Sequence, residues 1–166
     1  MDVQDKILPS IDLKIEEAVS DEDIASCFQV ITEDLRPHIK SVDELVSKVK
    51  RQRSEYAYRL MFIRDEDRDR DRDRNRDRHV VAILGYRIIQ GSDGLIYIEV
   101  DDIATLKAAR GQGLGGKMLD WILGFAQGNG YYTVQMDAGY ERHSAHRIFA
   151  KKGFVLTYCH FKILIG

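Results

Sequence analysis

The sequence is poor in the residues that stabilise small secreted, metal-bound or membrane proteins. Among its 166 residues there are two cysteines, Cys27 and Cys159, which are far apart and have no CxxC neighbour. A disulfide framework or a structural metal site is therefore not expected, and a reduced compartment suits the chain best. No apolar run reaches the roughly 20 residues of a membrane span, and acidic residues follow Met1 where a signal peptide would be basic. We expect a cytoplasmic protein that binds neither a metal nor a membrane.

The chain also lacks an excess of either charge. Its 25 basic and 27 acidic residues give a formal net charge of -2, so no overall positive field attracts nucleic acid. Residues 64–78 are nearly pure alternating Arg and Asp, with nothing apolar to bury. We interpret them as a solvated loop at a hairpin tip. The alternative is an RNA-binding element, which the internal pairing of its charges disfavours.

The apolar residues are sufficient for one ordinary core. They make up 44% of the chain, which suits a single domain over 1–166. Serines followed three residues later by an acid, at Ser20 and Ser41, predict two helix starts of the capping-box kind. Strands on both sides of single helices imply right-handed crossovers and a partly parallel sheet. Apolar spacing predicts helices over 24–35, 45–49, 114–125 and 141–151, and strands over 11–15, 58–63, 80–89, 95–105, 132–136 and 154–165.

A glycine-rich segment follows the long strand 95–105 and begins the next helix. Residues 110–117 read RGQGLGGK, with all four glycines between two basic residues. Glycines let the backbone turn tightly and approach a ligand. A helix N-terminus presents unpaired amides and a partial positive charge, which together hold phosphate. Arg110 and Lys117 add positive charge, so we interpret the segment as a phosphate-binding loop rather than an ordinary turn.

Two other phosphate-binding patterns fit this loop less well. A P-loop needs Ser or Thr after its lysine, and here Met118 follows Lys117. The dinucleotide pattern GxGxxG does match the glycines, and Asp137 lies where a ribose-binding acid is expected. That fold, however, runs its strand directly into the first glycine, whereas residues 107–110 intervene here. Too little chain also remains after Asp137 for the rest of a doubly wound sheet.

The pattern Arg-x-x-Gly-x-Gly at Arg110, Gly113 and Gly115 resembles the acetyl-CoA motif of the GCN5-related N-acetyltransferase (GNAT) superfamily. The segment 145–154, AHRIFAKKGF, resembles the A-x-x-x-Y-x-x-x-G-F signature near the C-terminal end of that family. The resemblance implies an α+β fold, an α/β/α sandwich. Its mixed, mostly antiparallel sheet would have about six or seven strands, splayed between the fourth and fifth, with about four flanking helices. Residues 64–78 would then be an insertion in the hairpin between the second and third strands.

The resemblance also implies a cofactor site and a reaction. Acetyl-CoA would donate its acetyl group to a primary amine of a small molecule or peptide by direct attack in a ternary complex. An amide near Thr105 would polarise the acetyl carbonyl, and no metal is required. The residues expected to bind acetyl-CoA are Ile103, Ala104 and Thr105 on the strand and Arg110, Gly111, Gln112, Gly113, Leu114, Gly115 and Gly116 in the loop.

Acidic residues on the same strand are the candidate catalytic groups, because the attacking amine must lose a proton. Asp101 matches the position where relatives carry a catalytic acid and is the first candidate, with Glu99 second. Alternation places these two on one face, and a bulge would bring Asp102 into consideration. The alternative is that the acids only bind a cationic acceptor. Phe149 stands where many relatives have a tyrosine that protonates the leaving thiolate, so the acid is water or a neighbour, or is dispensable.

Family resemblance places the acceptor against the first two helices and their connection. Arg36 and His38 in this stretch are the candidate substrate-binding residues, for a carboxylate or phosphate of the acceptor; the alternative is a helix-ending turn with solvent-facing polar residues. A homodimer is a further expectation, since dimers are common in the family. The missing tyrosine motivates an alternative function, a sensor module that binds acyl-CoA without turnover.

Overall fold

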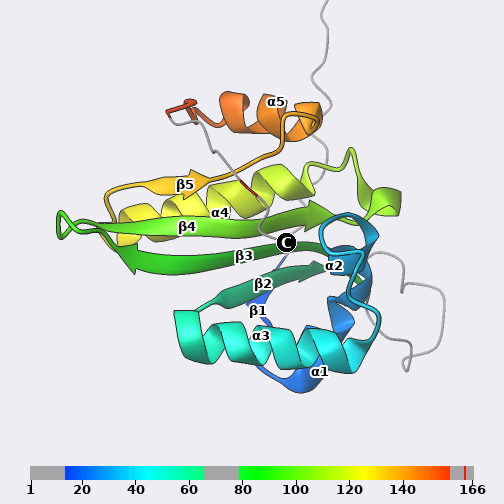
Figure 1. Ribbon diagram of the computed structural model, residues 1–166. Helices are drawn as coiled ribbons and strands as arrows, with labels where there is room; N and C mark the ends of the chain where they lie inside the picture. The colour runs from blue at the N-terminus through cyan, green and yellow to red at the C-terminus, as the bar shows by residue number, and fades with distance from the viewer. Residues whose placement is uncertain (1–13, 66–78, 158–162, 164–166) are drawn as a thin grey trace, which may run out of the picture.

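The computed structural model describes residues 14–65, 79–157 and 163 (Figure 1). Its sheet has the order β1-β2-β3-β4-β5, with antiparallel pairs up to β4 and a parallel β4–β5 pair. A crossover through α4 (Leu114–Gly128) joins the parallel strands, as predicted. The strands are β1 (Ile15–Glu17), β2 (Arg59–Arg64), β3 (Val80–Gln90), β4 (Ile96–Thr105) and β5 (Val134–Met136).

The described part of the chain therefore has five strands rather than the predicted six or seven. Most of the predicted first strand, residues 11–13, lies outside the described residues. The predicted last strand, 154–165, is wrong for Phe154–Thr157, which form no strand, and most of the remainder lies outside the described residues. Of the Arg/Asp segment, residues 66–78 also lie outside. The amide of Asp65 bonds to the carbonyl of His79 at 3.0 Å, so the two ends of that segment meet.

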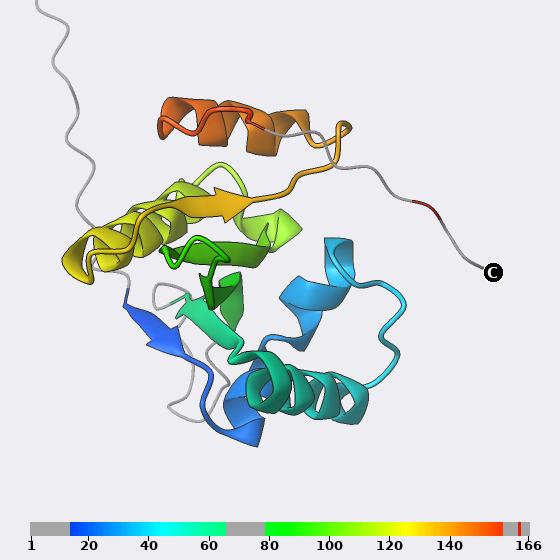
Figure 2. The ribbon, with the colours of Figure 1, turned by 60° about the vertical axis from the view of Figure 1, so that its left-hand side comes forward.

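Two layers of helices enclose the sheet (Figures 1 and 2). The helices α1 (Asp21–Ser26), α2 (Phe28–Asp34) and α3 (Val42–Tyr56) cover one face, and α4 covers the other. Tyr86 of β3 packs edge-on against Trp121 and Phe125 of α4, with ring centroids 6.0 and 5.8 Å apart. The last helix, α5 (His143–Lys151), lies beyond β5, far from α3, and none of its residues is buried.

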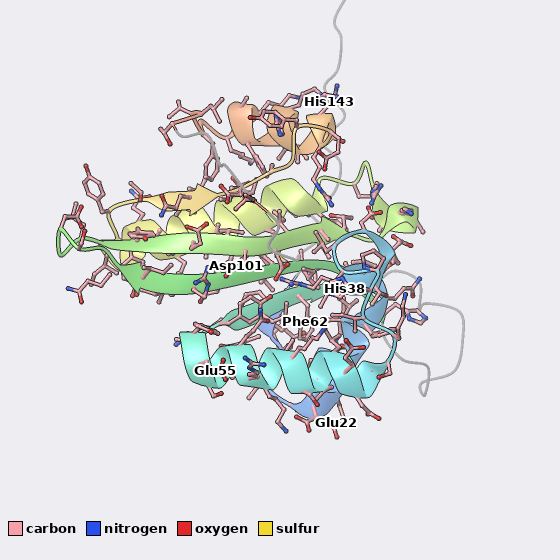
Figure 3. All side chains as sticks on the ribbon, in the orientation of Figure 1. Glu22, His38, Glu55, Phe62, Asp101 and His143 are labelled. Atoms are coloured by element: carbon pink, nitrogen blue, oxygen red, sulfur yellow. The ribbon has the colours of Figure 1, made fainter. Side chains whose placement is uncertain are left out.

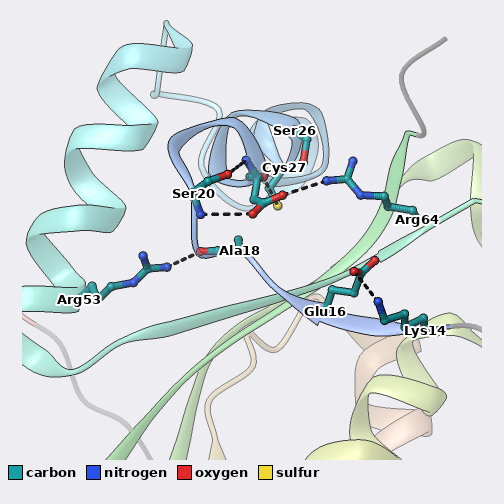
Figure 4. Close-up of polar contacts among 9 residues, drawn as sticks. Lys14, Glu16, Ala18, Ser20, Ser26, Cys27, Arg53 and Arg64 are labelled. Atoms are coloured by element: carbon teal, nitrogen blue, oxygen red, sulfur yellow. Dashed lines mark hydrogen bonds and ion pairs between the residues drawn. The ribbon is translucent and has the colours of Figure 1, made fainter. Parts of the chain in front are cut away.

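The first helix begins as predicted (Figure 4). The Ser20 hydroxyl accepts the Asp23 amide at 3.1 Å, and the Asp23 carboxylate accepts the Ser20 amide at 3.2 Å. The single helix predicted over 24–35 is wrong, because α1 ends at Ser26 and α2 begins at Phe28. The side chains of Ser26 and Cys27 both donate to the Asp23 carbonyl. The Cys27 amide, which would use that carbonyl in a regular helix, bonds to Ile24 instead.

The third helix is longer than the short one predicted at 45–49. The Ser41 hydroxyl caps it by accepting the Glu44 amide at 3.2 Å, whereas the Glu44 carboxylate accepts the amide of Lys40 rather than that of Ser41. Ion pairs one turn apart, Glu44 with Lys48 and Glu55 with Arg51, support the polar face of the helix. Arg53 donates to the carbonyl oxygens of Ala18 and Val19, which fastens the helix to the end of β1 (Figure 4).

A β-bulge interrupts β4 at its midpoint. Gly85 of β3 pairs with Asp102, and the next residue, Tyr86, pairs with Val100. Asp101 is thus the extra residue and has no partner on β3. The parallel pairing with β5 ends at the same place, since its last pair is Val100 with Met136. Residues 98–100 therefore have strands on both sides, whereas residues 102–105 pair only with β3 in the part of the chain that the structure describes.

Candidate functional site

The bulge changes the side of β4 to which the main-chain amides of even-numbered residues point. Before it, the Ile98 amide donates to the Thr133 carbonyl, toward β5, at 2.9 Å. After it, the Leu106 amide donates to the Val81 carbonyl on β3 at 2.8 Å. Because main-chain groups alternate along a strand, those of Ile103 and Thr105 point to the side on which the described residues form no strand. A ligand with an extended, amide-containing arm can pair with this edge as a sixth strand would.

The bulge also brings the Asp102 side chain to the α3 face of the sheet. Asp102 is 7% exposed. One guanidinium nitrogen of Arg36 donates to both of its oxygens, at 2.8 and 2.9 Å, and the Tyr58 hydroxyl donates to one of them at 2.8 Å. Burial, followed by the nearby charge of Asp102, raises the pKa of Tyr58 well above its ordinary value, so the phenol remains a donor. Asp102 is therefore fully engaged in a structural network.

Gly85 makes room for this network. A Cβ at this position would lie 1.9 Å from the Tyr58 hydroxyl oxygen. A side chain here would displace the phenol from its bond to Asp102. Sequence reasoning missed Gly85 and Tyr58. A glycine within the mostly apolar strand 80–89 was the available signal, because such a glycine marks a bulge or a close approach.

Glu99 and Asp101 differ in how they are held. Both Asp101 oxygens accept from Arg87, at 2.7 and 2.6 Å, which makes a two-point ion pair. Burial raises the pKa of the Glu99 carboxyl, and the charges of Asp101 and Asp137 raise it further, whereas Arg87 and Gln135 oppose the rise. Glu99 is thus a carboxyl with a raised pKa beside the ion pair of Asp101 and Arg87. Arg87 is a residue that sequence reasoning missed.

The glycine loop leads into α4 with its amides uncovered. Gly113 is the N-cap of α4 in the left-handed region, φ +76°, and no side chain caps the helix. The Lys117 amide makes the first intrahelical bond, to the Gly113 carbonyl at 3.0 Å. Residues 111–113 are exposed. The amides of the first helical turn therefore have no side-chain partner at the helix end, where the 15-residue helix also has a partial positive charge. This arrangement suits an anion.

Arg110 is held near this loop by the end of α2. Its guanidinium pairs with Asp34 and also reaches the Thr105 carbonyl at 3.3 Å. Lys107 approaches the same carboxylate at 3.5 Å, and its amide donates to Glu33 at 2.6 Å. Burial alone would raise the pKa of Asp34, but the hydrogen bond and charge of Arg110 outweigh it and lower that pKa. Asp34 thus pairs with Arg110, the cation that was predicted to reach phosphate.

The two predicted acceptor-binding residues are separated. Arg36 lies against Asp102, whereas His38 is exposed on the turn after α2 (Figure 3). The turn is closed by the Ile39 amide, which donates to the Arg36 carbonyl at 3.0 Å. Arg36 lines a cavity of about 260 Å³ between α3 and the bulge, and His38 is not part of the lining of that cavity. The structure therefore connects Arg36, but not His38, with the acids of β4.

The C-terminal signature contributes a hydrophobic contact rather than a phenol. Phe149 packs against Phe154, with ring centroids 5.9 Å apart. Nearby, the His146 ring contacts the Gly139 carbonyl at 2.9 Å, and Tyr140 is 80% exposed. Arg142 donates to the Asp34 carbonyl at 3.3 Å. None of these geometries marks a proton donor for a leaving group.

In the described residues, no group of three or more His, Cys, Asp or Glu side chains comes together as a candidate metal site. In the same residues, every helix is too short or too polar to cross a membrane.

The features above define an α+β domain with a half-open strand beside a helix N-terminus, and comparisons with known proteins agree. A model of the acetyltransferase (GNAT) family matches residues 32–154, well over half of the chain. The chain belongs to this family. No protein among the curated ones searched matches it significantly.

Solved structures share the whole fold at low sequence identity. A Trypanosoma brucei acetyltransferase is 15% identical, with a TM-score of 0.72 over 93% of this chain and 100% of its own. A ribosomal-protein-alanine N-acetyltransferase from Brucella melitensis is 13% identical, with a TM-score of 0.71 over 92% and 99%. A glucosamine-6-phosphate N-acetyltransferase from Arabidopsis thaliana is 15% identical, with a TM-score of 0.70 over 93% and 99%.

Proposed function

We propose that this chain transfers the acetyl group of acetyl-CoA to a primary amine of a small molecule or peptide, within a ternary complex. The observation that carries the proposal is the juxtaposition of two features: the main-chain edge of Ile103–Thr105, beside which the described residues place no strand, and the uncovered N-terminus of α4. The first suits the amide-containing pantetheine arm and the second the pyrophosphate. Two structural relatives are named as N-acetyltransferases, which supports an amine as the acceptor.

Each part of the site has a role in this proposal. The amides of Gly111–Gly116, Gln112 and Leu114 included, would hold the pyrophosphate, with Arg110 exchanging Asp34 for a phosphate oxygen. Ile103, Ala104 and Thr105 would bind the pantetheine arm and thioester through the main chain, and an amide near Thr105 would stabilise the developing oxyanion. No metal takes part in these steps.

The acids of β4 would manage the proton of the acceptor. Glu99, directly or through a water molecule, would accept the proton that the amine loses as its nitrogen bonds to the acetyl carbon. Asp101 would hold Arg87 and keep the local charge balanced. The carbon–sulfur bond then breaks, and the thiolate of CoA takes a proton from solvent. A thiol with a pKa of about 8.5 is a tolerable leaving group without a dedicated acid, consistent with Phe149 at that position.

The first test is isothermal titration of the purified protein with acetyl-CoA, beside an Arg110→Ala, Gly113→Ala double variant. We expect micromolar binding that the variant loses. An amine screen that follows thiol release, with Glu99→Gln and Asp101→Asn as variants, then tests turnover. An absence of binding to the unaltered protein would remove the proposal.

A second candidate function is a sensor that binds acyl-CoA without turnover. The packing of Phe149 against Phe154 favours it, because this position cannot supply a proton. The amine screen separates the two candidates. Tight acyl-CoA binding with no thiol release across a broad panel of amines would support the sensor, and steady release with any one amine would exclude it.

A further inference from the structure

The cavity between α3 and the bulge of β4 has one polar wall and one apolar wall. Its volume is about 260 Å³. The apolar wall consists of Ile31, Ile39, Leu45 and Val49, which are core residues only 2–4% exposed. Asp102 also lines it, and the neighbouring residue in the bulge is Asp101. The cavity therefore reaches the part of β4 that carries the candidate catalytic acids.

The polar wall carries more positive than negative charge. Arg36, Lys48 and Arg51 line the cavity, and the carboxylate that lines it is Asp102. Lys48 and Arg51 pair with Glu44 and Glu55 at 2.8 and 3.0 Å, but these two acids lie outside the lining, and the paired Lys48 and Arg51 side chains remain 46% and 73% exposed. An anionic group inside the cavity would meet these cations directly.

Arg36 is placed to anchor such a group. It donates to both oxygens of Asp102 through a single nitrogen, Nη2, and its side chain remains 33% exposed. A guanidinium has five N–H donors. The three on Nε and Nη1 contact no acceptor among the described residues. Asp102, itself held by Tyr58, thus fixes a guanidinium with unused donors at the cavity, and a charge-assisted hydrogen bond from one of these donors suits a carboxylate.

The size of the cavity limits the ligand. Pockets for drug-sized ligands have volumes of about 300–1,000 Å³, and this one is smaller. It can enclose a compact body with a short apolar group, but not the whole of a long polyamine or an oligosaccharide.

We propose that this cavity binds the acceptor, and that the acceptor is a small amino acid-like amine with a carboxylate and an apolar side chain. Arg36 binds the carboxylate, Lys48 and Arg51 add attraction at the mouth, and the apolar wall receives the side chain. The amine lies on the β4 side, with Asp101 and Glu99. As an acceptor site, the cavity rests on the proposed acetyl transfer, but its ligand preference can be measured without that reaction.

The test compares leucine, methionine and phenylalanine with their amides, which lack only the negative charge. Binding is followed by NMR chemical-shift titration in the presence of CoA and in its absence, and turnover by thiol release from acetyl-CoA. We expect each amino acid to bind about tenfold or more tightly than its amide, since a charge-assisted bond is lost, with the largest shifts around Arg36 and α3.

A variant on the exposed rim keeps the test independent of folding. Replacing Arg36 would leave Asp102 without its partner, so the informative variant is Lys48→Gln with Arg51→Gln. We expect it to weaken amino acid binding about two- to fivefold, while leaving the amides and acetyl-CoA unchanged. Lys50→Gln is the matched control, because Lys50 lies on the same helix but pairs with Asp21 at 3.0 Å, away from the cavity.

The outcomes separate the cavity from the reaction. Equal binding of acids and amides, no binding of the acids at tens of millimolar, or preferred acetylation of spermidine would overturn the inference while leaving acetyl transfer standing. Selective binding of the acids to a protein that does not bind acetyl-CoA would instead remove the proposed function and retain the carboxylate-binding cavity.

Discussion

The two halves of β4 have similar lengths but different surroundings. Residues 96–100 pair with β3, and residues 98–100 also pair with β5; Ile98 and Val100 are buried between layers. Residues 102–105 pair only with β3 in the described part of the chain, and Ile103–Thr105 are partly exposed. The first half contributes apolar burial and a full set of backbone bonds. The second half leaves backbone groups available, which costs stability and provides a binding edge.

Asp101 and Asp102, adjacent in the sequence, show the same contrast. Asp102 is buried in a network with Arg36 and Tyr58, whereas Asp101 pairs with Arg87 nearer the surface. One carboxylate thus serves the fold and the other lies where a ligand can reach it. The lesson is that similar residue types on one strand can have opposite roles, and that packing decides between them.

The largest expected effect separates these two acids by stability. Asp102→Ala should lower the free energy of unfolding by about 3–5 kcal/mol, because it leaves Arg36 and Tyr58 without their buried partner. Asp101→Ala should cost less than about 1 kcal/mol, since its ion pair is partly exposed. Urea unfolding followed by circular dichroism measures both. Equal losses of unfolding free energy in the two variants would show that Asp101 and Asp102 contribute alike to the stability of the fold.

The next effect concerns catalysis. Glu99→Gln should lower kcat about a hundredfold, the usual contribution of a general base, with little change in acetyl-CoA affinity. Asp101→Asn should lower kcat less, because Asp101 acts mainly through Arg87. Steady-state thiol release gives both values once an acceptor is known. A larger loss in Asp101→Asn than in Glu99→Gln would make Asp101 the base.

The pH dependence of kcat sharpens this assignment. Burial and the charges of Asp101 and Asp137 raise the pKa of Glu99, so the acidic limb of the kcat profile should lie above the value of about 4.3 typical of an exposed glutamate. Arg87 opposes this rise, so Arg87→Gln should move the limb to higher pH. A limb that stays in place in Arg87→Gln would exclude Glu99 as its source.

The smallest expected effect tests the contact of Arg110 with α2. Asp34→Asn removes the carboxylate that Arg110 must leave in order to bind phosphate. Acetyl-CoA should then bind about two- to fivefold more tightly, the scale of an exposed ion pair. Glu55→Gln, which removes an exposed acid of α3 far from the loop, is the matched control for the change in net charge. Weaker binding in Asp34→Asn would show that Asp34 positions Arg110 rather than competing with phosphate.

The sequence allowed most of the fold to be predicted, because it follows from local signals. The capping box at Ser20, the strands on either side of the Arg/Asp segment and the glycines before α4 each depend on neighbouring residues. The break at Cys27 could not be predicted in this way, since it depends on which donors take the Asp23 carbonyl. The predicted last strand fails over 154–157 for a related reason: apolar alternation does not guarantee a partner strand.

The candidate site was predicted in its residue types but not in its contacts. Alternation placed Glu99 with Asp101, and a bulge was foreseen as the condition that would involve Asp102. The partners of these acids, Arg87, Arg36 and Tyr58, come from distant parts of the chain, and nothing local specifies such pairs. The predicted roles of the loop glycines and of Ile103–Thr105 remain predictions.

The bulge at Asp101 has a consequence for how this strand tolerates change in length. Asp101 is the residue without a partner on β3, since Val100 pairs with Tyr86 and Asp102 with Gly85. Deleting Asp101 would therefore restore regular alternation and leave Asp102, Ile103 and Thr105 facing as they do now. Deleting a paired residue such as Ile103 would instead turn the residues that follow it to the opposite face.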